Sequence, residues 1–455
     1  MDVLIAGGGI SGLSLAFLLL KSRPDIDVTV FESEPRTGGK IWTEKHNGYT
    51  LEGGVNGFLD NRPKTLELAG MLGLPPLSSS DKARKRFIYK EGSLRQIMES
   101  PLGFITSDLL SLSGKLRLLY EAVAPRGCED DETLRDFAVR RLGREAFETL
   151  IEPMATGIYA GDAEKLSLKS CFPKINNLEM LHGSLLVGMV KMKLAAGKTG
   201  REVSAGPGGK LTSFDGGMES LIAALRDSLG NRIKTGVRVV SVDKTGDGYT
   251  VALGNTETVT AQRVVLATPA YATAEILRDF DSSMPKELSK IPYPSVMVMC
   301  MGFKRESFTE DFDAFGFLVP SKENRKILGT LCDSCIFPGR APEGRVLLRT
   351  MTGGARASES AAMWSDEKAE DVVLGELSEI MRVKGIPELV KIYRHEKAIP
   401  QYNVGHAAIL ARITESLKKH EGLYLHGNSY KGIGVNDCIE GSFKLSTEIL
   451  NSMNT

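Results

Sequence analysis

At 455 residues the chain is too long for one hydrophobic core, so two or more domains are expected. Hydrophobic residues make up 42% of it and charged residues 25%, which is typical of a soluble globular protein. Lys and Arg together number 57, as do Asp and Glu, so no net charge recruits nucleic acid and an anionic ligand must be held by local cations.

The first residues carry a dinucleotide-binding fingerprint. Residues 2–6 are predicted to form a buried strand and residues 13–21 a helix, and between them lies the G-x-G-x-x-G segment Gly7, Gly8, Gly9, Ile10, Ser11 and Gly12. A second predicted strand at 28–31 ends at Glu32, about 20 residues beyond the glycines, where a carboxylate accepts hydrogen bonds from ribose hydroxyls. The helix N-terminus faces the phosphate charge, so these parts together predict a dinucleotide site.

Two later segments favour a flavin over a nicotinamide. An R-x-G-G segment follows the second strand and consists of Arg36, Thr37, Gly38, Gly39 and Lys40. It resembles the second nucleotide motif of the glutathione-reductase-like flavoproteins, especially the amine-oxidase and desaturase branch, in which the arginine supplies a cation for the phosphates. Residues 52–58 are predicted to run as a loop under an isoalloxazine ring. A nicotinamide enzyme needs neither segment, so FAD is the predicted cofactor.

The order of predicted elements indicates an α/β fold with α+β insertions. Residues 107–200 are mostly helical by period, with a break near 153–161, and the buried strand at 263–269 returns the chain to the dinucleotide domain. We therefore predict a discontinuous Rossmann-type FAD domain, a β-sheet substrate domain, and a helical domain that is a candidate for membrane association. Their boundaries are predicted at 1–80, 205–270 and 401–455 for the FAD domain, 81–105 and 271–400 for the substrate domain, and 106–204 for the helical domain.

The segment 153–162, Pro-Met-Ala-Thr-Gly-Ile-Tyr-Ala-Gly-Asp, resembles the oxygen-dependent protoporphyrinogen oxidases of haem synthesis. The resemblance covers essentially the whole chain, through further blocks at 214–217, 315–320, 328–330, 337–338, 399–403 and 427–439. These blocks are more specific than the nucleotide fingerprint, which many flavoproteins share.

The resemblance implies a role for each matching residue. FAD would be held by the Gly7 to Gly12 segment, Glu32, Ser33, Lys40, the loop residues Gly54, Val55, Asn56 and Gly57, the backbone of Val239, and Asn428, Ile433, Gly434 and Val435. Arg86 matches an arginine that pairs with a substrate propionate, and Gly157 matches a glycine whose backbone carbonyl faces the pyrrole N–H groups. Leu318 and Phe337 match apolar residues that sandwich the macrocycle. From the residues alone, Arg86 reads as a solvated surface cation, and Leu318 and Phe337 read as core residues.

The implied chemistry is stepwise. A porphyrinogen loses six hydrogens in three two-electron rounds at one flavin, each followed by reoxidation with oxygen and release of hydrogen peroxide. Asn56 is hypothesised to polarise the reacting pyrrole through a hydrogen bond. Coproporphyrinogen III, with four propionates rather than two, is the alternative substrate, and extra cations such as Lys82, Arg84 or Lys85 at the pocket mouth would favour it. Another amine oxidase, a carotenoid desaturase, or a non-catalytic flavin-bound scaffold are the remaining alternatives.

The cysteines and the apolar segments indicate the cellular compartment of the protein and its contact with a membrane. The six cysteines are mostly isolated, which indicates reduced thiols in a cytoplasmic protein. The C-x-x-C pair Cys332 and Cys335 reads as two small apolar residues in preference to a redox pair. Residues 181–190 are expected to form either a core helix or a peripheral contact with the inner face of the cell membrane. A hand-off of product to ferrochelatase and a monomeric or homodimeric state are further expectations, and no metal-ligand spacing occurs among the histidines.

Overall fold

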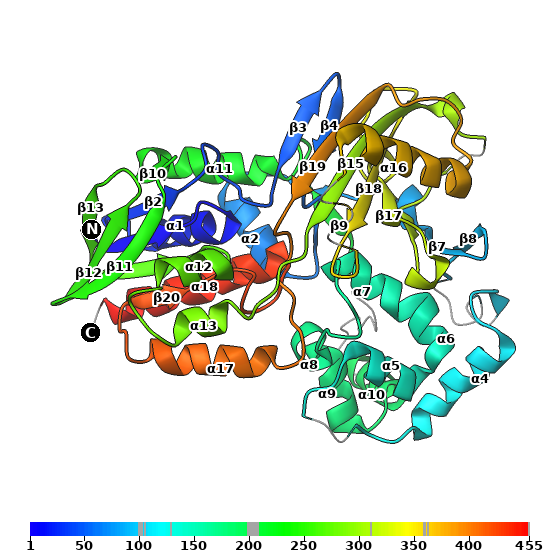
Figure 1. Ribbon diagram of the computed structural model, residues 1–455, viewed down its shortest axis with the longest axis horizontal. Helices are drawn as coiled ribbons and strands as arrows, with labels where there is room; N and C mark the ends of the chain where they lie inside the picture. Colours follow the sequence, from blue (N-terminus) through cyan, green and yellow to red (C-terminus); the bar gives the residue numbers. More distant parts are fainter. Residues whose placement is uncertain are drawn as a thin grey trace.

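The computed structural model describes residues 1–98, 103, 106–127, 130–197, 209–309, 312–357, 361 and 364–453. Figure 1 shows three regions: a sheet flanked by helices on the left, a second sheet at the upper right, and a cluster of helices at the lower right. Each region has its own group of buried apolar side chains.

A five-stranded parallel sheet organises the first region. Its order is β10 (Ile233–Thr235), β2 (Val28–Glu32), β1 (Val3–Ala6), β14 (Arg263–Leu266) and β20 (Leu423–Leu425). These strands come from the N-terminal, central and C-terminal parts of the chain, as the discontinuous FAD domain predicts. Three helices cover one face, namely α1 (Ile10–Ser22), α11 (Glu219–Leu229) and α18 (Val435–Ser452).

The opposite face of this sheet is covered by a β-meander and three helices. They are β11 (Val239–Thr245), β12 (Gly248–Leu253), β13 (Thr258–Ala261), α12 (Ala270–Ile276), α13 (Met284–Leu288) and α17 (His406–Leu417). Successive residues of a strand point to opposite faces, so Val3 and Ile5 pack under α1 while Leu4 and Ala6 pack on this side. The central segment therefore extends beyond residue 270, where the sequence prediction ends it, because α12 and α13 bury their apolar faces here and not in the substrate domain.

A seven-stranded sheet forms the second region. Its order is β19 (Leu389–His395), β15 (Val296–Lys304), β18 (Arg345–Gly353), β17 (Ile327–Cys332), β16 (Gly316–Leu318), β7 (Arg86–Lys90) and β8 (Ser93–Gln96). Helix α16 (Asp366–Met381) packs on one face against Phe317 and Val319. The other face is turned toward the first region, because the hairpin β3 (Thr43–His46) and β4 (Tyr49–Glu52) packs on it.

Short elements connect the two sheets. They include α2 (Pro63–Met71), the three-stranded sheet β5 (Phe58–Leu59), β9 (Leu211–Ser213) and β6 (Leu77–Ser78), the 3-10 turn η1 (Asp81–Arg84), and α14 (Asp333–Ile336).

The third region is helical. It contains α4 (Leu112–Leu119), η2 (Tyr120–Val123), α5 (Leu134–Leu142), α6 (Arg144–Ala146), η3 (Phe147–Ile151), α7 (Glu152–Tyr159), α8 (Leu168–Cys171), α9 (Pro173–His182) and α10 (Leu185–Gly197). The predicted break near 153–161 is wrong over most of its length, because α7 is helical up to Tyr159. Pro153 stands in the first turn of α7, where a proline removes no helical hydrogen bond, and the helix ends only at Ala160, which has a φ of 46°.

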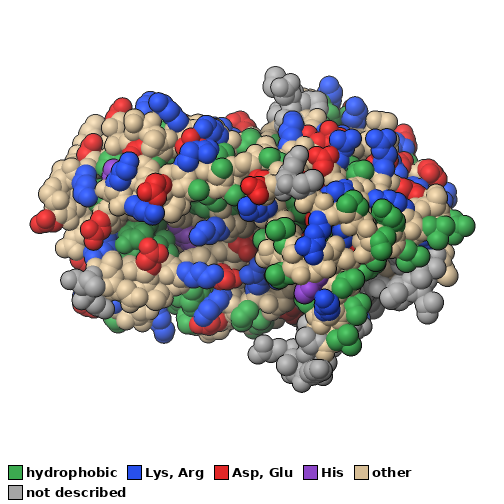
Figure 2. All heavy atoms as spheres, turned by 90° about the horizontal axis from the view of Figure 1, so that it is seen from below, with side chains coloured by type: hydrophobic (Ala, Val, Ile, Leu, Met, Phe, Trp, Pro, Cys, Tyr) green, Lys and Arg blue, Asp and Glu red, His purple; other side chains and the backbone are tan. Residues whose placement is uncertain are grey.

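Apolar side chains gather on the surface of the helical region, on the right of Figure 2. The exposed residues are Leu112, Leu116, Leu119, Tyr120 and Val123 on α4 and η2, and Met180, Leu181, Leu186, Val187, Val190, Met192 and Leu194 on α9 and α10. We call this group the apolar patch. Among the residues that the structure describes, no helix combines the length and the hydropathy needed to span a bilayer.

Candidate functional site

The glycine loop lies at the carboxyl end of β1, where the chain turns into α1. Gly7 has a φ of 109°, which favours glycine, and a Cβ on Gly12 would lie only 2.0 Å from the Gly7 carbonyl oxygen. By contrast, apart from its two chain neighbours, no atom of a described residue lies within 4 Å of a Cβ position on Gly9. The loop is thus tightly packed at Gly7 and Gly12 and open at Gly9, which fits the approach of a pyrophosphate to the N-terminus of α1.

Glu32 ends the neighbouring strand and faces the same loop. Its carboxylate accepts hydrogen bonds from the Gly8 N–H at 2.7 Å, the Glu34 N–H at 2.9 Å and the Ser33 hydroxyl at 3.2 Å. These bonds orient the carboxylate beside the glycines, where the sequence places a ribose contact.

Arg36 shapes the second nucleotide segment. Its guanidinium donates to the carbonyl oxygens of Thr37, Gly39 and Ile41 and lies over the Trp42 ring at 4.4 Å. The sequence predicts a cation for the phosphates. The structure adds that this cation organises the backbone of its own loop. The Gly38 N–H bonds the Gly8 carbonyl at 2.8 Å, so the R-x-G-G segment lies directly against the first glycine loop.

The distant segments predicted to complete the FAD site lie beside Glu32 and the glycine loop. The Val237 N–H donates to the Glu32 carbonyl oxygen at 2.9 Å, which brings the backbone before Val239 beside Glu32. The Val239 side chain is buried in the core. A Cβ on Gly427 would lie 3.7 Å from Ser11 Oγ, so Asn428 follows directly beside the glycine loop. From there the chain runs through Ile433 and Gly434 into α18 at Val435.

The residues fit FAD. In addition to the open space before Gly9, the hydroxyl of Thr37 is buried without a hydrogen-bond partner among the described residues, which suits a loop that receives a polar ligand. When bound, FAD supplies a two-electron acceptor.

The Gly54 to Gly57 loop is held by residues that sequence reasoning missed. Asn56 Nδ2 donates to Asp333 Oδ1 at 3.2 Å, and Arg349 Nε lies 3.2 Å from Asp333 Oδ2. Arg349 also donates to the Gly54 carbonyl at 2.6 Å. On the other side of the loop, His395 Nε2 lies 2.7 Å from the Gly53 carbonyl oxygen, and burial lowers the pKa of His395.

A buried ion pair lies behind this loop. Glu52 Oε1 lies 3.4 Å from Arg340 Nη2 and accepts a hydrogen bond from the Met218 N–H at 3.0 Å. Both side chains are almost fully buried, and burial raises the pKa of Glu52 to about 7. The carboxylate joins the β3–β4 hairpin to α11, which supports the loop from the FAD side.

One face of the seven-stranded sheet, called the large sheet below, runs from the Gly54 to Gly57 loop, called the flavin loop below, to Arg86. Strand registers place Arg86 opposite Gly316, Gly316 opposite Leu331, and Leu331 opposite Arg349. Directly paired residues point to the same face, and three strand spacings correspond to about 14 Å. Arg349 reaches the flavin loop at one end of this row, and Arg86 is exposed at the other.

The next row of the sheet is apolar. It runs from Ile88 through Leu318 and Gly329 to Met351, and the Leu318 and Met351 side chains are only half-buried. Helix α7 covers this row, because a Cβ on Gly157 would lie 2.9 Å from Leu318 Cδ2. Gly157 and Leu318, 161 positions apart by their numbers, therefore meet over the sheet.

Phe337 belongs to the apolar cluster against which Leu331 packs. Its side chain is 1% exposed and packs with Ala83 and Ile336 under the guanidinium of Arg340, 5.3 Å from the ring centroid. This arrangement matches the reading of Phe337 as a core residue. On the sheet face, Leu331 and Met351 are the half-buried apolar residues beside Leu318, and only the strand register could have found them.

Few basic side chains near Arg86 lack an ion pair with a described residue. Arg86 lies over the Phe315 ring at 4.9 Å and forms no ion pair with a described residue. Lys85 is also exposed and has no such pair, whereas Arg84 pairs with Asp81 at 2.9 Å; the side chain of Lys82 lies outside the described residues.

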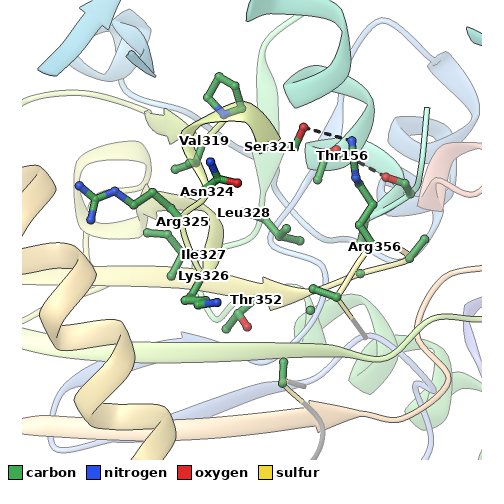
Figure 3. Close-up of a pocket in the computed structure, with 18 of the residues that line it drawn as sticks. Thr156, Val319, Ser321, Asn324, Arg325, Lys326, Ile327, Leu328, Thr352 and Arg356 are labelled. Atoms are coloured by element: carbon green, nitrogen blue, oxygen red, sulfur yellow. Dashed lines mark hydrogen bonds between the residues drawn. The ribbon is translucent and has the colours of Figure 1, made fainter. Parts of the chain in front are cut away.

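A cavity of about 330 Å³ opens beside α7 at Thr156 and Ala160, and Figure 3 shows its lining. Its basic residues are largely neutralised. Arg356 bonds the Ser321 hydroxyl at 3.1 Å and lies 3.5 Å from Glu152 Oε1, and burial raises the pKa of Glu152. The cavity therefore offers little unpaired positive charge for a substrate carboxylate.

Known proteins share both sequence and fold with this chain. Coproporphyrinogen III oxidase of Bacillus subtilis (strain 168) is 32% identical over 96% of this chain and 95% of its own length. The chloroplastic protoporphyrinogen oxidase of Oryza sativa subsp. japonica is 33% identical over 98% of this chain and 88% of its own length. A crystal structure of an Exiguobacterium sp. 255-15 protein provisionally named protoporphyrinogen oxidase covers 99% of both chains, with a TM-score of 0.84 and 26% identity.

The family comparison agrees with the geometry of the site. The model of the flavin containing amine oxidoreductases matches residues 10–450, which include the Glu32 carboxylate, the Gly54 to Gly57 loop and the sheet face with Arg86. The chain belongs to the flavin containing amine oxidoreductase family.

Proposed function

We propose that this chain oxidises protoporphyrinogen IX to protoporphyrin IX with FAD as cofactor and molecular oxygen as the final electron acceptor. The substrate loses six hydrogens in three two-electron rounds, and three molecules of oxygen become three of hydrogen peroxide. This proposal agrees with the names of the relatives and with the family.

The row across the large sheet is the observation that carries the proposal. A reacting carbon must lie at the flavin while a propionate, at the rim of the same flat ring, finds a cation. Arg349 at the flavin loop and Arg86 lie about 14 Å apart on one face, a span suited to a tetrapyrrole with its side chains. The apolar row through Leu318 and Met351 runs beside this span and is covered by α7.

Each residue then has a role that its surroundings support. Arg86 binds a propionate, because a guanidinium pairs with a carboxylate through two hydrogen bonds. Gly157 brings its helix close to Leu318, and its carbonyl accepts from pyrrole N–H groups. Asn56 has its amide N–H directed to Asp333, so its side-chain oxygen is the atom that remains to polarise a pyrrole.

Coproporphyrinogen III is the second candidate. One observation favours it: Lys85 stands exposed next to Arg86 without an ion pair to a described residue, so a second carboxylate could be bound there. The neutralised cavity beside α7 and the Asp81-bound Arg84 do not add to that charge.

Anaerobic reduction of the bound flavin by each porphyrinogen tests the function. We expect rapid bleaching of the flavin absorbance and its recovery on admission of oxygen, with protoporphyrinogen IX giving the higher ratio of reduction rate to Kd. In Arg86→Ala the half-saturating concentration should rise about tenfold or more, with FAD content unchanged, because a charge-assisted pair is lost. Absence of bleaching by either porphyrinogen would contradict the oxidase and favour a non-catalytic scaffold.

Arg84→Ala is the matched control. Arg84 is an exposed arginine two residues away whose pair with Asp81 is solvent-screened, so half-saturation should stay within about twofold of the native value. If both variants behaved like the native protein, Arg86 would lose its assigned role.

We also propose that the apolar patch rests on a membrane surface, where helices with exposed Leu and Val side chains bury them at the headgroup boundary. Hand-off of the porphyrin to ferrochelatase, and a monomeric or homodimeric state, stay predictions of the resemblance.

Sedimentation with phosphatidylglycerol–phosphatidylethanolamine vesicles tests the membrane contact. Leu181→Asp combined with Val190→Asp should weaken binding about tenfold or more, because two apolar side chains can no longer be buried. Ile386→Asp is the control, since Ile386 is 85% exposed but lies outside the apolar patch. Equal losses in both variants, or no binding by the native protein, would refute the contact.

A further inference from the structure

The C-x-x-C pair differs from its sequence prediction. Cys332 and Cys335 are joined in a disulfide, with their Cα atoms 5.2 Å apart, rather than standing as two unpaired small residues. The bridge encloses the single turn α14, which begins at Asp333. Nothing in the reaction proposed above uses these two sulfur atoms.

Asp333 sits inside this bridged turn and faces the flavin loop. It is 1% exposed. Its Oδ1 accepts a hydrogen bond from Asn56, and its Oδ2 forms an ion pair with Arg349 Nε at 3.2 Å without a hydrogen bond. Arg349, itself 4% exposed, carries the connection on to the Gly54 carbonyl. The only polar contacts that fasten Asn56 and Gly54 to the large sheet, among the described residues, thus pass through one buried carboxylate and its guanidinium partner.

We propose that Asp333 is a positioning residue for the flavin loop, and that the Cys332–Cys335 disulfide holds Asp333 in place. A carboxylate buried with a guanidinium is sensitive to small displacements, because removal or misplacement of one partner leaves the other desolvated without compensation. Opening the bridge separates the two sulfur atoms to at least van der Waals contact and releases the turn that carries Asp333. The flavin loop then loses two of its anchors together.

The bridge is also chemically accessible from one side. Cys332 is fully buried, whereas Cys335 is half-buried with its sulfur 3.2 Å from the Phe312 carbonyl oxygen. A thiolate reductant therefore attacks Cys335 first, forms a mixed disulfide there, and releases Cys332 as the thiol. Re-formation with hydrogen peroxide balances as two thiols plus one peroxide giving one disulfide and two waters. The peroxide is the product of the proposed oxidase, and in that respect the inference rests on the proposed function.

FAD affinity measured without any porphyrinogen tests the inference independently of the substrate. Native apoprotein is compared before and after reduction with dithiothreitol and anaerobic desalting, and alkylation with peptide mass spectrometry reports the state of Cys332 and Cys335. Quenching of free FAD fluorescence then gives Kd. We expect Kd to rise about tenfold on reduction, the effect of one charge-assisted hydrogen bond, and to return after treatment with hydrogen peroxide.

Three variants sharpen the result. Asp333→Asn should raise Kd in both redox states and leave less than about a twofold difference between them. The double variant Cys332→Ser and Cys335→Ser should have the FAD Kd of the reduced native protein, and dithiothreitol should not change it. Cys171→Ser, a free cysteine of α8 in the helical region, should behave like the native protein.

Two outcomes would overturn the proposal. One is complete reduction of the pair with an unchanged FAD Kd in the native protein, a result that needs no variant to fold. The other is full alkylation of both cysteines in folded protein already exposed to air and peroxide, which would show that no disulfide forms. Failure of porphyrinogen to bleach the flavin would leave this test unaffected and would count against the proposed function alone.

Discussion

Replacing Gly12 with valine is expected to remove FAD from the protein. A Cβ at this position would lie 2.0 Å from the Gly7 carbonyl oxygen, a backbone atom that cannot move without separating α1 from β1. Overpacking of this kind costs about 1–3 kcal/mol, and here the strain falls on the loop that receives the pyrophosphate. We expect FAD affinity to fall about 100-fold or more, measured by flavin content after purification and by titration of the apoprotein.

Two further glycines separate loss of the fold from loss of the ligand. Gly9→Ala should leave the stability of the apoprotein unchanged, because among the residues that the structure describes only its chain neighbours come within 4 Å of its Cβ. It should weaken FAD binding by occupying the open space before the loop. Gly375→Ala, on an exposed position of α16 that is equally unobstructed by described residues, should leave FAD binding unchanged and raise stability by up to about 1 kcal/mol through helix propensity. If Gly9→Ala bound FAD normally, the open space at Gly9 would not be the pyrophosphate site.

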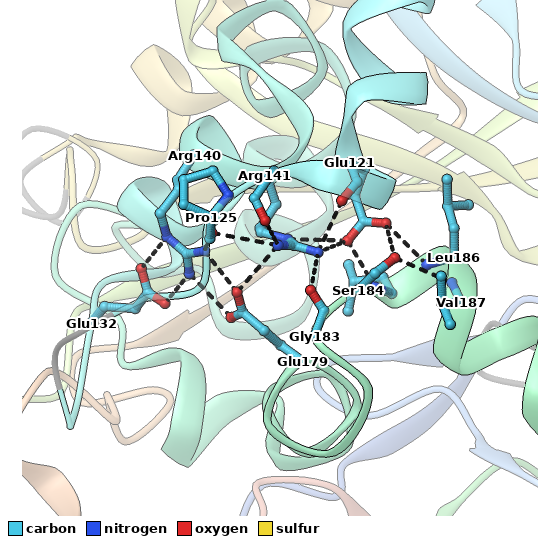
Figure 4. Close-up of polar contacts among 12 residues, drawn as sticks. Glu121, Pro125, Glu132, Arg140, Arg141, Glu179, Gly183, Ser184, Leu186 and Val187 are labelled. Carbon is cyan, nitrogen blue, oxygen red and sulfur yellow. Dashed lines mark hydrogen bonds and ion pairs between the residues drawn. The ribbon is translucent and has the colours of Figure 1, made fainter.

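Of the substitutions proposed here, Arg141→Met is expected to cause the largest loss in the free energy of unfolding. Figure 4 shows the network: Arg141 is 0% exposed, pairs with the 1%-exposed Glu121, and donates to the carbonyls of Ala124 and Gly183. Glu121 in turn accepts from the Leu185 N–H at 2.7 Å and the Leu186 N–H at 3.0 Å, which ties η2 to α10. Removing one member of a buried pair costs about 3–5 kcal/mol, because the remaining charge is left without compensation.

Chemical denaturation followed by circular dichroism measures this loss. Adding Glu121→Gln to Arg141→Met should recover part of the free energy of unfolding, because the stranded charge is removed. The control is Arg144→Met, which breaks an exposed i,i+4 pair with Glu148 in the same region and should cost less than about 0.5 kcal/mol. A loss below about 1 kcal/mol for Arg141→Met would show that the pair does not support the helical region.

The assignment of Phe337 to the substrate stays a prediction, whereas the reading of Cys332 and Cys335 as unpaired is wrong. Phe337 was assigned to the substrate by resemblance, yet its ring is buried under Arg340. The strand register, which no periodicity reveals, instead places Leu331 and Met351 beside Leu318. The C-x-x-C pair was read as unpaired because spacing alone does not show whether a turn brings two sulfur atoms together.

The sequence by itself determined the parts whose chemistry is local. The spacing of Gly7, Gly9 and Gly12 at the start of a helix, with Glu32 at the end of the next strand, predicts a dinucleotide-binding unit, because turn, dipole and carboxylate act within one βαβ unit. The R-x-G-G segment and the Gly54 to Gly57 loop extended that prediction to FAD, and the order of predicted elements gave a domain in three pieces. The parallel sheet contains strands from all three.

Only the tertiary structure decided which distant residues share a site. The Asp333–Arg349 connection to Asn56 and Gly54, the row from Arg349 to Arg86, and the packing of α12 and α13 on the FAD side depend on contacts between segments tens to hundreds of residues apart. Such contacts follow from which apolar faces bury one another and in what register, and a one-residue shift of a strand would turn each side chain to the other face. That choice is made by the whole packed molecule, so it could not be read from any one segment.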